Sequence, residues 1–185
     1  IRRRFLKKTK NDLVLVMLAN AASIVSFKID ASSGTCEYNL NESGWETYTS
    51  NNSISLNVGD VLMWRGELVP EPYSSIGQFS ITEDVDLSGT PMSLLKGNRL
   101  FDKVFYGLFY NCTGIKNVSA DFLPATTLED YCYAYMFEGC TSLTTAPELP
   151  ATTIAIANYC YYYMFYNCTS LTTAPSILPA TMLAN

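Results

Sequence analysis

The chain of 185 residues carries the stretch Cys132-Tyr133-Ala134-Tyr135-Met136-Phe137-Glu138-Gly139-Cys140-Thr141, which returns 28 positions later as Cys160-Tyr161-Tyr162-Tyr163-Met164-Phe165-Tyr166-Asn167-Cys168-Thr169. A looser copy lies 28 positions earlier, at Val104-Phe105-Tyr106-Gly107-Leu108-Phe109-Tyr110-Asn111-Cys112-Thr113. A second block, Leu-Pro-Ala-Thr, recurs at 123–126, 149–152 and 178–181, with prolines 26 and then 29 positions apart. A constant core spacing with loops of variable length is typical of stacked structural repeats.

The apolar residues inside one copy are spaced as on a helix. They stand at i, i+4, i+5 and i+8, which predicts one apolar helix face: Cys132, Met136, Phe137 and Cys140. The following residues 142–147 predict a short extended segment. We therefore expect each copy to be one helix plus one short strand, which buries its apolar face only by stacking on its neighbours.

The tyrosines are concentrated in the second and third copies. Tyr133, Tyr135, Tyr161 and Tyr163 lie outside the expected core face, so we predict that they flank it and partly reach solvent. Exposed tyrosine rings suit glycan stacking or protein recognition, because each ring offers a large area at a small entropic cost. The alternative is that these rings pack between adjacent copies and only wall the stack.

Residues 12–97 carry a different pattern. Short runs of alternating apolar and polar residues are separated by turn signals at intervals of roughly 8–12 residues. The runs that we expect to be strands are 24–30, 35–40, 45–48, 54–58, 61–65, 76–81 and 85–87. This spacing predicts a small antiparallel β-sandwich-like domain.

The net charge of −5 hides a basic start on an acidic body. Arg2, Arg3, Arg4, Lys7 and Lys8 lie within the first ten residues, and residues 11–185 hold only six basic groups against 17 acidic ones. We interpret residues 1–11 as an anchoring arm and expect no nucleic-acid partner. The apolar run at 13–22 lacks a preceding Met and is shorter than the roughly 20 residues of a membrane-spanning helix, so we expect neither a cleaved signal nor a membrane span.

The composition argues against catalysis. The chain has no histidine, which excludes His-containing triads, His proton shuttles and His-ligated metals. Phosphate-binding glycine loops, nucleophile elbows and metal-spaced cysteine pairs are also absent from the sequence. The acids Glu83, Asp84 and Asp86 fit a solvated turn better than a Ca²⁺ site. We expect no enzyme activity, no metal and no cofactor.

The six cysteines are interpreted as packing residues. Cys112, Cys140 and Cys168 occupy one place in the repeat and Cys132 and Cys160 another, so they should stack as buried free thiols. We predict no disulfides.

The sequence from Met136 to Thr152 resembles the BspA-like leucine-rich repeats of gut Bacteroidetes surface proteins. The segments Gly44 to Tyr48, Ile54 to Asp60 and Ile76 to Ile81 resemble more loosely the β-domain that often precedes such repeats. The resemblance implies a non-enzymatic protein that is extracellular or displayed on a particle and contacts proteins, glycans or host surfaces. The Arg-rich start is similar to that of structural proteins from Bacteroides-infecting phages, including crAss-like phages.

The expected fold class is therefore α+β. We predict a basic arm at 1–11, a β-sandwich-like domain at 12–97, and about three BspA-like leucine-rich repeats forming a helix–strand solenoid at 98–185, with an incomplete C-terminal end. The expected function is structural and recognition work, as a phage virion component of the head or tail fibre type whose repeats bind host protein or glycan. The alternative is a Bacteroidetes cell-surface adhesin. Both settings place the chain on an extracellular surface, next to other protein subunits.

Overall fold

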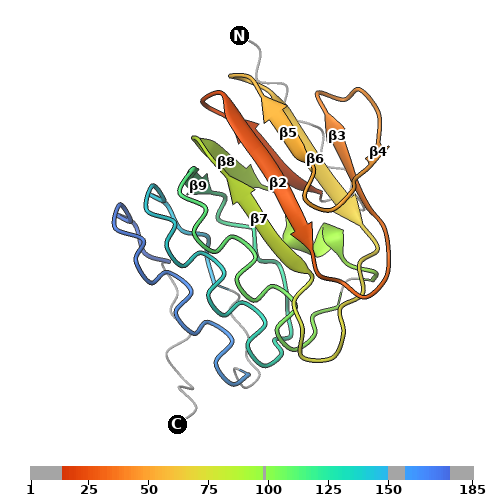
Figure 1. The fold of residues 1–185 in the computed structure, drawn as a ribbon. Coiled ribbons are helices and arrows are strands. Elements are labelled where there is room, and N and C mark those ends of the chain that lie inside the picture. Colours follow the sequence, from red (N-terminus) through yellow and green to blue (C-terminus); the bar gives the residue numbers. More distant parts are fainter. Residues whose placement is uncertain (1–13, 98, 150–156, 176–185) are drawn as a thin grey trace.

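A computed structural model describes residues 14–97, 99–149 and 157–175. Within these ranges the secondary structure is nine strands and one short 3₁₀ helix (Figure 1). The elements are β1 (Leu15–Ala19), β2 (Ser23–Ile29), β3 (Cys36–Leu40), β4 (Glu46–Thr47), β5 (Ser53–Leu56), β6 (Val61–Gly66), β7 (Gly77–Ile81), β8 (Val85–Ser88), η1 (Pro91–Leu94) and β9 (Ile115–Val118).

The strands form two sheets. A six-stranded sheet has the order β4-β3-β6-β1-β8-β9, and a three-stranded sheet has the order β5-β2-β7. Every pair is antiparallel except β8 with β9, which is parallel. The sheets pack against each other through aromatic rings. The ring centroid of Trp64 in β6 lies 6.1 Å from that of Phe27 and 5.2 Å from that of Phe79, and both phenylalanines belong to the smaller sheet.

The strands expected before residue 97 are present, because alternation directs one side chain in two toward the core. Val25 and Phe27 are buried, whereas Ile24 and Lys28 are exposed. The first residue of β7 has to be a glycine. Gly77 has a φ of +137°, and a Cβ atom at this position would lie 1.9 Å from the Lys28 carbonyl oxygen.

The prediction of an α+β chain ending in a helix–strand leucine-rich-repeat solenoid is wrong. The described residues contain no α-helix, and the positions expected to be helical are turns. Every fourth residue of a copy has a left-handed backbone, as at Tyr131, Tyr135 and Gly139, with φ of 55°, 59° and 72°. A period of four residues lies close to the 3.6 of an α-helix, so both conformations bury the same apolar positions.

Backbone hydrogen bonds in the copies follow an alternating rule. Even-numbered N–H groups close turns within a copy, as Met136 does by donating to the Tyr133 carbonyl. Odd-numbered N–H groups donate to the next copy, as Tyr133 does to the Cys160 carbonyl and Phe105 to the Cys132 carbonyl, both at 3.0 Å. In an α-helix, all of these N–H groups would donate to carbonyls of the same helix. The copies therefore lie side by side, each bonded to the next (Figure 1).

The stacked copies continue the two sheets directly. Ile76 and Phe79 donate backbone hydrogen bonds to the carbonyls of Val104 and Leu108 in the first copy. The extended segments after each copy extend the parallel pairing of β9 through bridges from Asn117 to Thr145 and on to Thr173. Buried residues of the sheets and of the copies form one continuous hydrophobic core.

A column of phenylalanine rings crosses this core. Phe27 and Phe79 stack at 4.1 Å between ring centroids, and Phe109, Phe137 and Phe165 follow at 5.3, 5.5 and 5.8 Å, with neighbouring planes within 14° of parallel. We call these five residues the phenylalanine column. It gives each copy the same register as the β7 strand against which the first copy packs.

Cysteine thiols run alongside the phenylalanine column. Cys140 and Cys168 donate through Sγ to the carbonyl of the phenylalanine one copy earlier, at 3.2 and 3.1 Å, and Cys112 donates in the same way to the carbonyl of Phe79 in β7 at 3.1 Å. All six cysteines of the chain are free thiols.

Some of the expectations concern residues that the structure does not describe. The arm residues Arg2, Arg3, Arg4, Lys7 and Lys8 lie outside the described residues. The third Leu-Pro-Ala-Thr block and all but Leu149 of the second block lie outside them as well. In the part of the chain that is described, no helix has the length and apolar character needed to span a bilayer.

We expect Phe109→Ala to lower the free energy of unfolding by about 3–5 kcal/mol, because its fully buried ring lies between two others and would leave a cavity. The matched variant is Phe165→Ala, since Phe165 is only half-buried and, among the described residues, its ring stacks on Phe137 alone. Its loss should be less than half as large. Urea unfolding of both variants measures the difference, and equal losses would contradict a continuous column.

Candidate functional site

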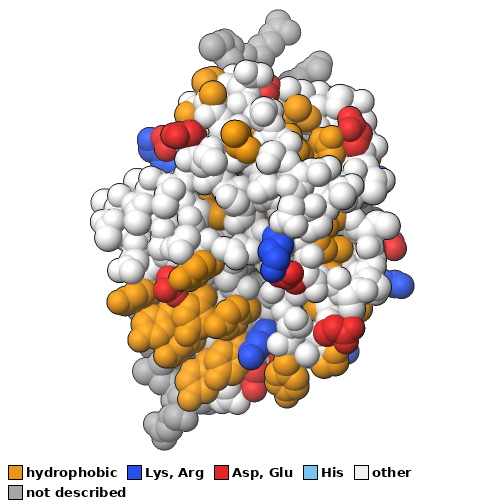
Figure 2. All heavy atoms as spheres, in the orientation of Figure 1, with side chains coloured by type: hydrophobic (Ala, Val, Ile, Leu, Met, Phe, Trp, Pro, Cys, Tyr) orange, Lys and Arg blue, Asp and Glu red, His pale blue; other side chains and the backbone are white. Residues whose placement is uncertain are grey.

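Tyrosine side chains gather on one face of the stacked copies, where Figure 2 shows a continuous area of hydrophobic side chains. We call this surface the tyrosine face. It comprises Tyr106, Tyr110, Tyr131, Tyr135, Tyr159, Tyr162, Tyr163 and Tyr166. Six of these side chains are between 38% and 57% exposed, whereas Tyr131 and Tyr135 are half-buried.

Left-handed residues place the rings of the tyrosine face. Tyr131, Tyr135, Tyr159 and Tyr163 all have φ between 51° and 59°. This conformation costs an L-residue about 1–2 kcal/mol. The bonds to the next copy compensate: the N–H of Tyr131 donates to the Asn158 carbonyl and that of Tyr135 to the Tyr162 carbonyl.

The rings of the tyrosine face touch one another across copies. Tyr135 contacts Tyr106 at 4.9 Å between centroids, Tyr162 at 5.4 Å and Tyr163 at 5.7 Å. Tyr163 contacts Tyr166 at 5.0 Å, and Tyr131 stacks on Tyr159 at 5.0 Å. The rings therefore hold each other in place, so little side-chain entropy remains to be lost on binding.

The four tyrosines predicted to bind a ligand divide into two pairs. Tyr135 and Tyr163 lie on the tyrosine face. Tyr133 is fully buried and stacks between Phe105 and Tyr161, at 5.9 and 6.2 Å. Tyr133 and the half-buried Tyr161 thus pack between adjacent copies of the repeat. This packing role is the alternative to ligand binding that the sequence leaves open for each of these tyrosines.

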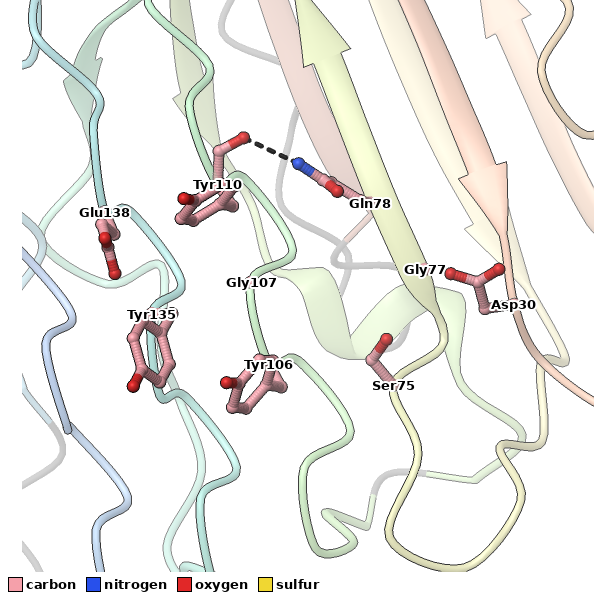
Figure 3. Close-up of a pocket in the computed structure, with 9 residues that line it drawn as sticks. All are labelled: Asp30, Ser75, Gly77, Gln78, Tyr106, Gly107, Tyr110, Tyr135 and Glu138. Atoms are coloured by element: carbon pink, nitrogen blue, oxygen red, sulfur yellow. Dashed lines mark hydrogen bonds between the residues drawn. The ribbon is translucent and has the colours of Figure 1, made fainter.

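A pocket of about 380 Å³ opens where the tyrosine face meets β7. Figure 3 shows Tyr106, Tyr110 and Tyr135 on one side, with Asp30, which directly follows β2, and Gln78 of β7 on the other. The residues that line it are Asp30, Ser75, Gly77, Gln78, Tyr106, Gly107, Tyr110, Tyr135 and Glu138. Gln78 is held by a hydrogen bond of 2.8 Å from its Nε2 to the Tyr110 carbonyl.

The polar groups of this pocket are unequally satisfied. Asp30 pairs with Lys28 at 2.8 Å, so its charge is compensated locally. The Glu138 Oε2 atom is buried and has no hydrogen-bond partner among the described residues. Partial desolvation, together with the adjacent Tyr106, raises the pKa of Tyr135, so its hydroxyl is protonated at neutral pH and able to donate.

Sequence reasoning missed most of the pocket and part of the tyrosine face. On the tyrosine face, Tyr162 and Tyr166 could have been found from the same tyrosine-rich run as Tyr161 and Tyr163. Asp30 and Gln78 had no signal, because each is an ordinary polar residue at a strand position and only the packing of the first copy on β7 brings them to the tyrosines.

Acidic residues that could have held a metal ion make contacts within the protein instead. Asp84 pairs with Lys116 at 3.0 Å, and Asp86 accepts from Asn117 at 2.8 Å. Asp130 accepts the backbone N–H of Asn158 at 2.8 Å. No group of three His, Cys, Asp or Glu residues suited to a metal ion occurs in the described ranges.

Comparison with protein-family models, with curated proteins and with solved structures found no match for this chain.

We expect the thiols to be inert in the native protein, since the thiolate is the reactive form. Burial raises the pKa of Cys36, Cys112, Cys132 and Cys160 to about 12 and that of Cys168 to about 11, and it also raises the pKa of Cys140. Iodoacetamide at neutral pH should alkylate native protein slowly, Cys168 first, and the rate should keep rising above pH 9.

The unfolded chain is the control for this experiment. In guanidinium chloride without reductant, all six thiols should react with ordinary pH dependence. Fewer than six modified cysteines after unfolding, or one that reacts at once in the native protein, would contradict the assignment of six buried free thiols.

Proposed function

We propose that the chain is a non-enzymatic recognition protein displayed on an exposed surface, and that the tyrosine face is its binding surface. The observation that carries the proposal is the gathering of exposed tyrosines on one face, six of them 38–57% exposed. Contiguous exposed apolar area on a soluble protein marks an interaction site. Tyrosine suits such a surface because its ring packs on a partner while its hydroxyl remains a donor and acceptor.

The order within the tyrosine face supports binding over simple exposure. The rings are fixed by contacts of 4.4–5.7 Å with their neighbours. A surface that is already ordered loses less entropy when a partner docks, which raises affinity. The repeat also places equivalent positions at regular intervals along the stack, which suits a ligand that itself repeats.

The setting that we favour is a bacteriophage virion component of the head or tail fibre type. Its support is the similarity of the Arg-rich start to that of structural proteins from Bacteroides-infecting phages. The alternative is a Bacteroidetes cell-surface adhesin, supported by the resemblance of residues 136–152 to BspA-like repeats. In both settings the tyrosine face is turned outward.

We expect the triple variant Tyr162→Ala, Tyr163→Asn, Tyr166→Ala to weaken binding to its target surface by about tenfold or more, because anchoring aromatic residues carry most of an interface's affinity. Asparagine is chosen at position 163 since it tolerates the left-handed backbone there. The measurement is binding of the fluorescently labelled chain to Bacteroides cells and to mucin-coated wells.

The matched control is Tyr73→Asn. Tyr73 is 68% exposed and also left-handed, at φ 60°, but it is not part of the tyrosine face. It should bind as the unmodified chain does. Tyrosine-dependent binding to Bacteroides cells supports the virion setting, and such binding to mucin alone supports the adhesin. Binding to neither surface, or equal loss in the control, contradicts the proposed function.

A further inference from the structure

The pocket beside the tyrosine face combines ring faces with unused hydrogen-bonding groups. Its volume of about 380 Å³ lies within the range of roughly 300–1,000 Å³ typical of small-molecule sites. The rings of Tyr106 and Tyr135 are 4.9 Å apart and tilted by 47°, and they form one wall. Figure 3 shows Glu138 and Gln78 near the same opening, from the second copy and from β7.

Glu138 carries an unmet requirement for a hydrogen-bond donor. Its Oε2 is buried without a partner in the described part of the chain. Buried acceptors are nearly always hydrogen-bonded, and leaving a charged one unpaired costs more than leaving a neutral one unpaired. A ligand hydroxyl that donates to this carboxylate would reduce the cost.

Gln78 provides a second acceptor in a fixed orientation. One of its two Nε2 hydrogens donates to the Tyr110 carbonyl at 2.8 Å, which fixes the orientation of the amide, and Oε1 remains an acceptor for a ligand. The hydroxyl of Ser75 lines the same space. The polar side of the pocket is therefore suited to a ligand with several hydroxyl donors.

The charges around the pocket disfavour ions of either sign. Lys103 Nζ already lies 5.9 Å from the Tyr106 ring centroid and 5.4 Å from that of Tyr131, so a ligand ammonium on these rings would meet a like charge. An anionic ligand would meet the carboxylate of Glu138, which lines the pocket. A neutral ligand avoids both repulsions.

We propose that this pocket binds a neutral hexopyranose unit of a glycan. The C–H face of the sugar ring packs on Tyr106 and Tyr135, whose ring faces carry partial negative charge. Sugar hydroxyls donate to the carboxylate of Glu138 and to Gln78 Oε1. The inference rests on the proposed recognition function and names its ligand class and the residues that select it.

The test uses saturation-transfer NMR and calorimetric titration of the full chain with three probes. These are neutral gluco-, galacto- and manno-oligosaccharides, an oligouronate, and choline. We expect one neutral series to bind. Glu138→Gln and Tyr106→Ala should each weaken that binding by about tenfold or more, since the first removes a charged hydrogen-bond acceptor and the second removes a ring that packs on the sugar.

Two control variants lie outside the pocket. Glu71→Gln removes an exposed carboxylate that does not line the pocket, and Tyr73→Asn removes an exposed ring that belongs neither to the pocket nor to the tyrosine face. Both should leave the sugar affinity within about twofold. Gln78→Leu is a second pocket variant, and the thermal unfolding midpoint of each variant verifies that it is folded.

Several outcomes would overturn the inference. Binding of choline or of the oligouronate in place of neutral sugars would do so, as would sugar binding that does not change in the Glu138, Tyr106 and Gln78 variants. If no saccharide binds while the chain still attaches to cells or mucin through Tyr162, Tyr163 and Tyr166, this inference fails and the proposed function stands. If surface attachment is also absent, both fail.

Discussion

The structure depends on the phenylalanine column, Phe27–Phe79–Phe109–Phe137–Phe165. Its first two rings belong to the smaller sheet and its last three to the stacked copies, so a single line of ring contacts joins the strands to the repeats. Because each ring is parallel to the last within 14°, the register of β7 is transmitted to every copy. The cysteine thiols that donate to phenylalanine carbonyls reinforce the same spacing.

The surface properties follow from this register. Copies that are fixed 28 positions apart in sequence bring equivalent residues side by side, so tyrosines at matching positions become neighbours. The first copy carries Lys103 and Gly107 where the later copies carry tyrosine, and this is where the pocket opens toward β7. The departure of the first copy from the pattern thus creates room beside Tyr106 that the later copies fill with rings.

The sequence predicted the repeat, its 28-residue spacing and the burial of Cys132, Met136, Phe137 and Cys140, because those depend only on which residues are apolar, but it did not predict the burial of Tyr133. It also predicted the strands before residue 97, since alternation is a direct signal of a half-buried strand. It did not predict the backbone of the copies: a four-residue turn period and a helix bury the same residues, and the left-handed conformation of Tyr131 and Tyr135 is unfavourable for an isolated tyrosine. Only the hydrogen bonds between copies make it favourable. The pocket could not be predicted either, because Asp30 and Gln78 reach the tyrosines through tertiary packing alone.

The alternating use of backbone donors gives the stack a chemical polarity. In the third copy the N–H groups of odd-numbered residues such as Tyr161, Tyr163 and Phe165 have no backbone acceptor within the described residues, whereas the carbonyls of Cys160, Tyr162 and Met164 are already used by the second copy. An ordinary sheet edge offers donors and acceptors in alternation and can pair with a second copy of itself. Among the described residues, the turns of the third copy offer free backbone donors but no free backbone acceptors at this edge. Two such edges related by a twofold axis would place N–H groups opposite N–H groups, so a segment that presents carbonyls can pair with these turns, whereas the same edge of a second molecule cannot.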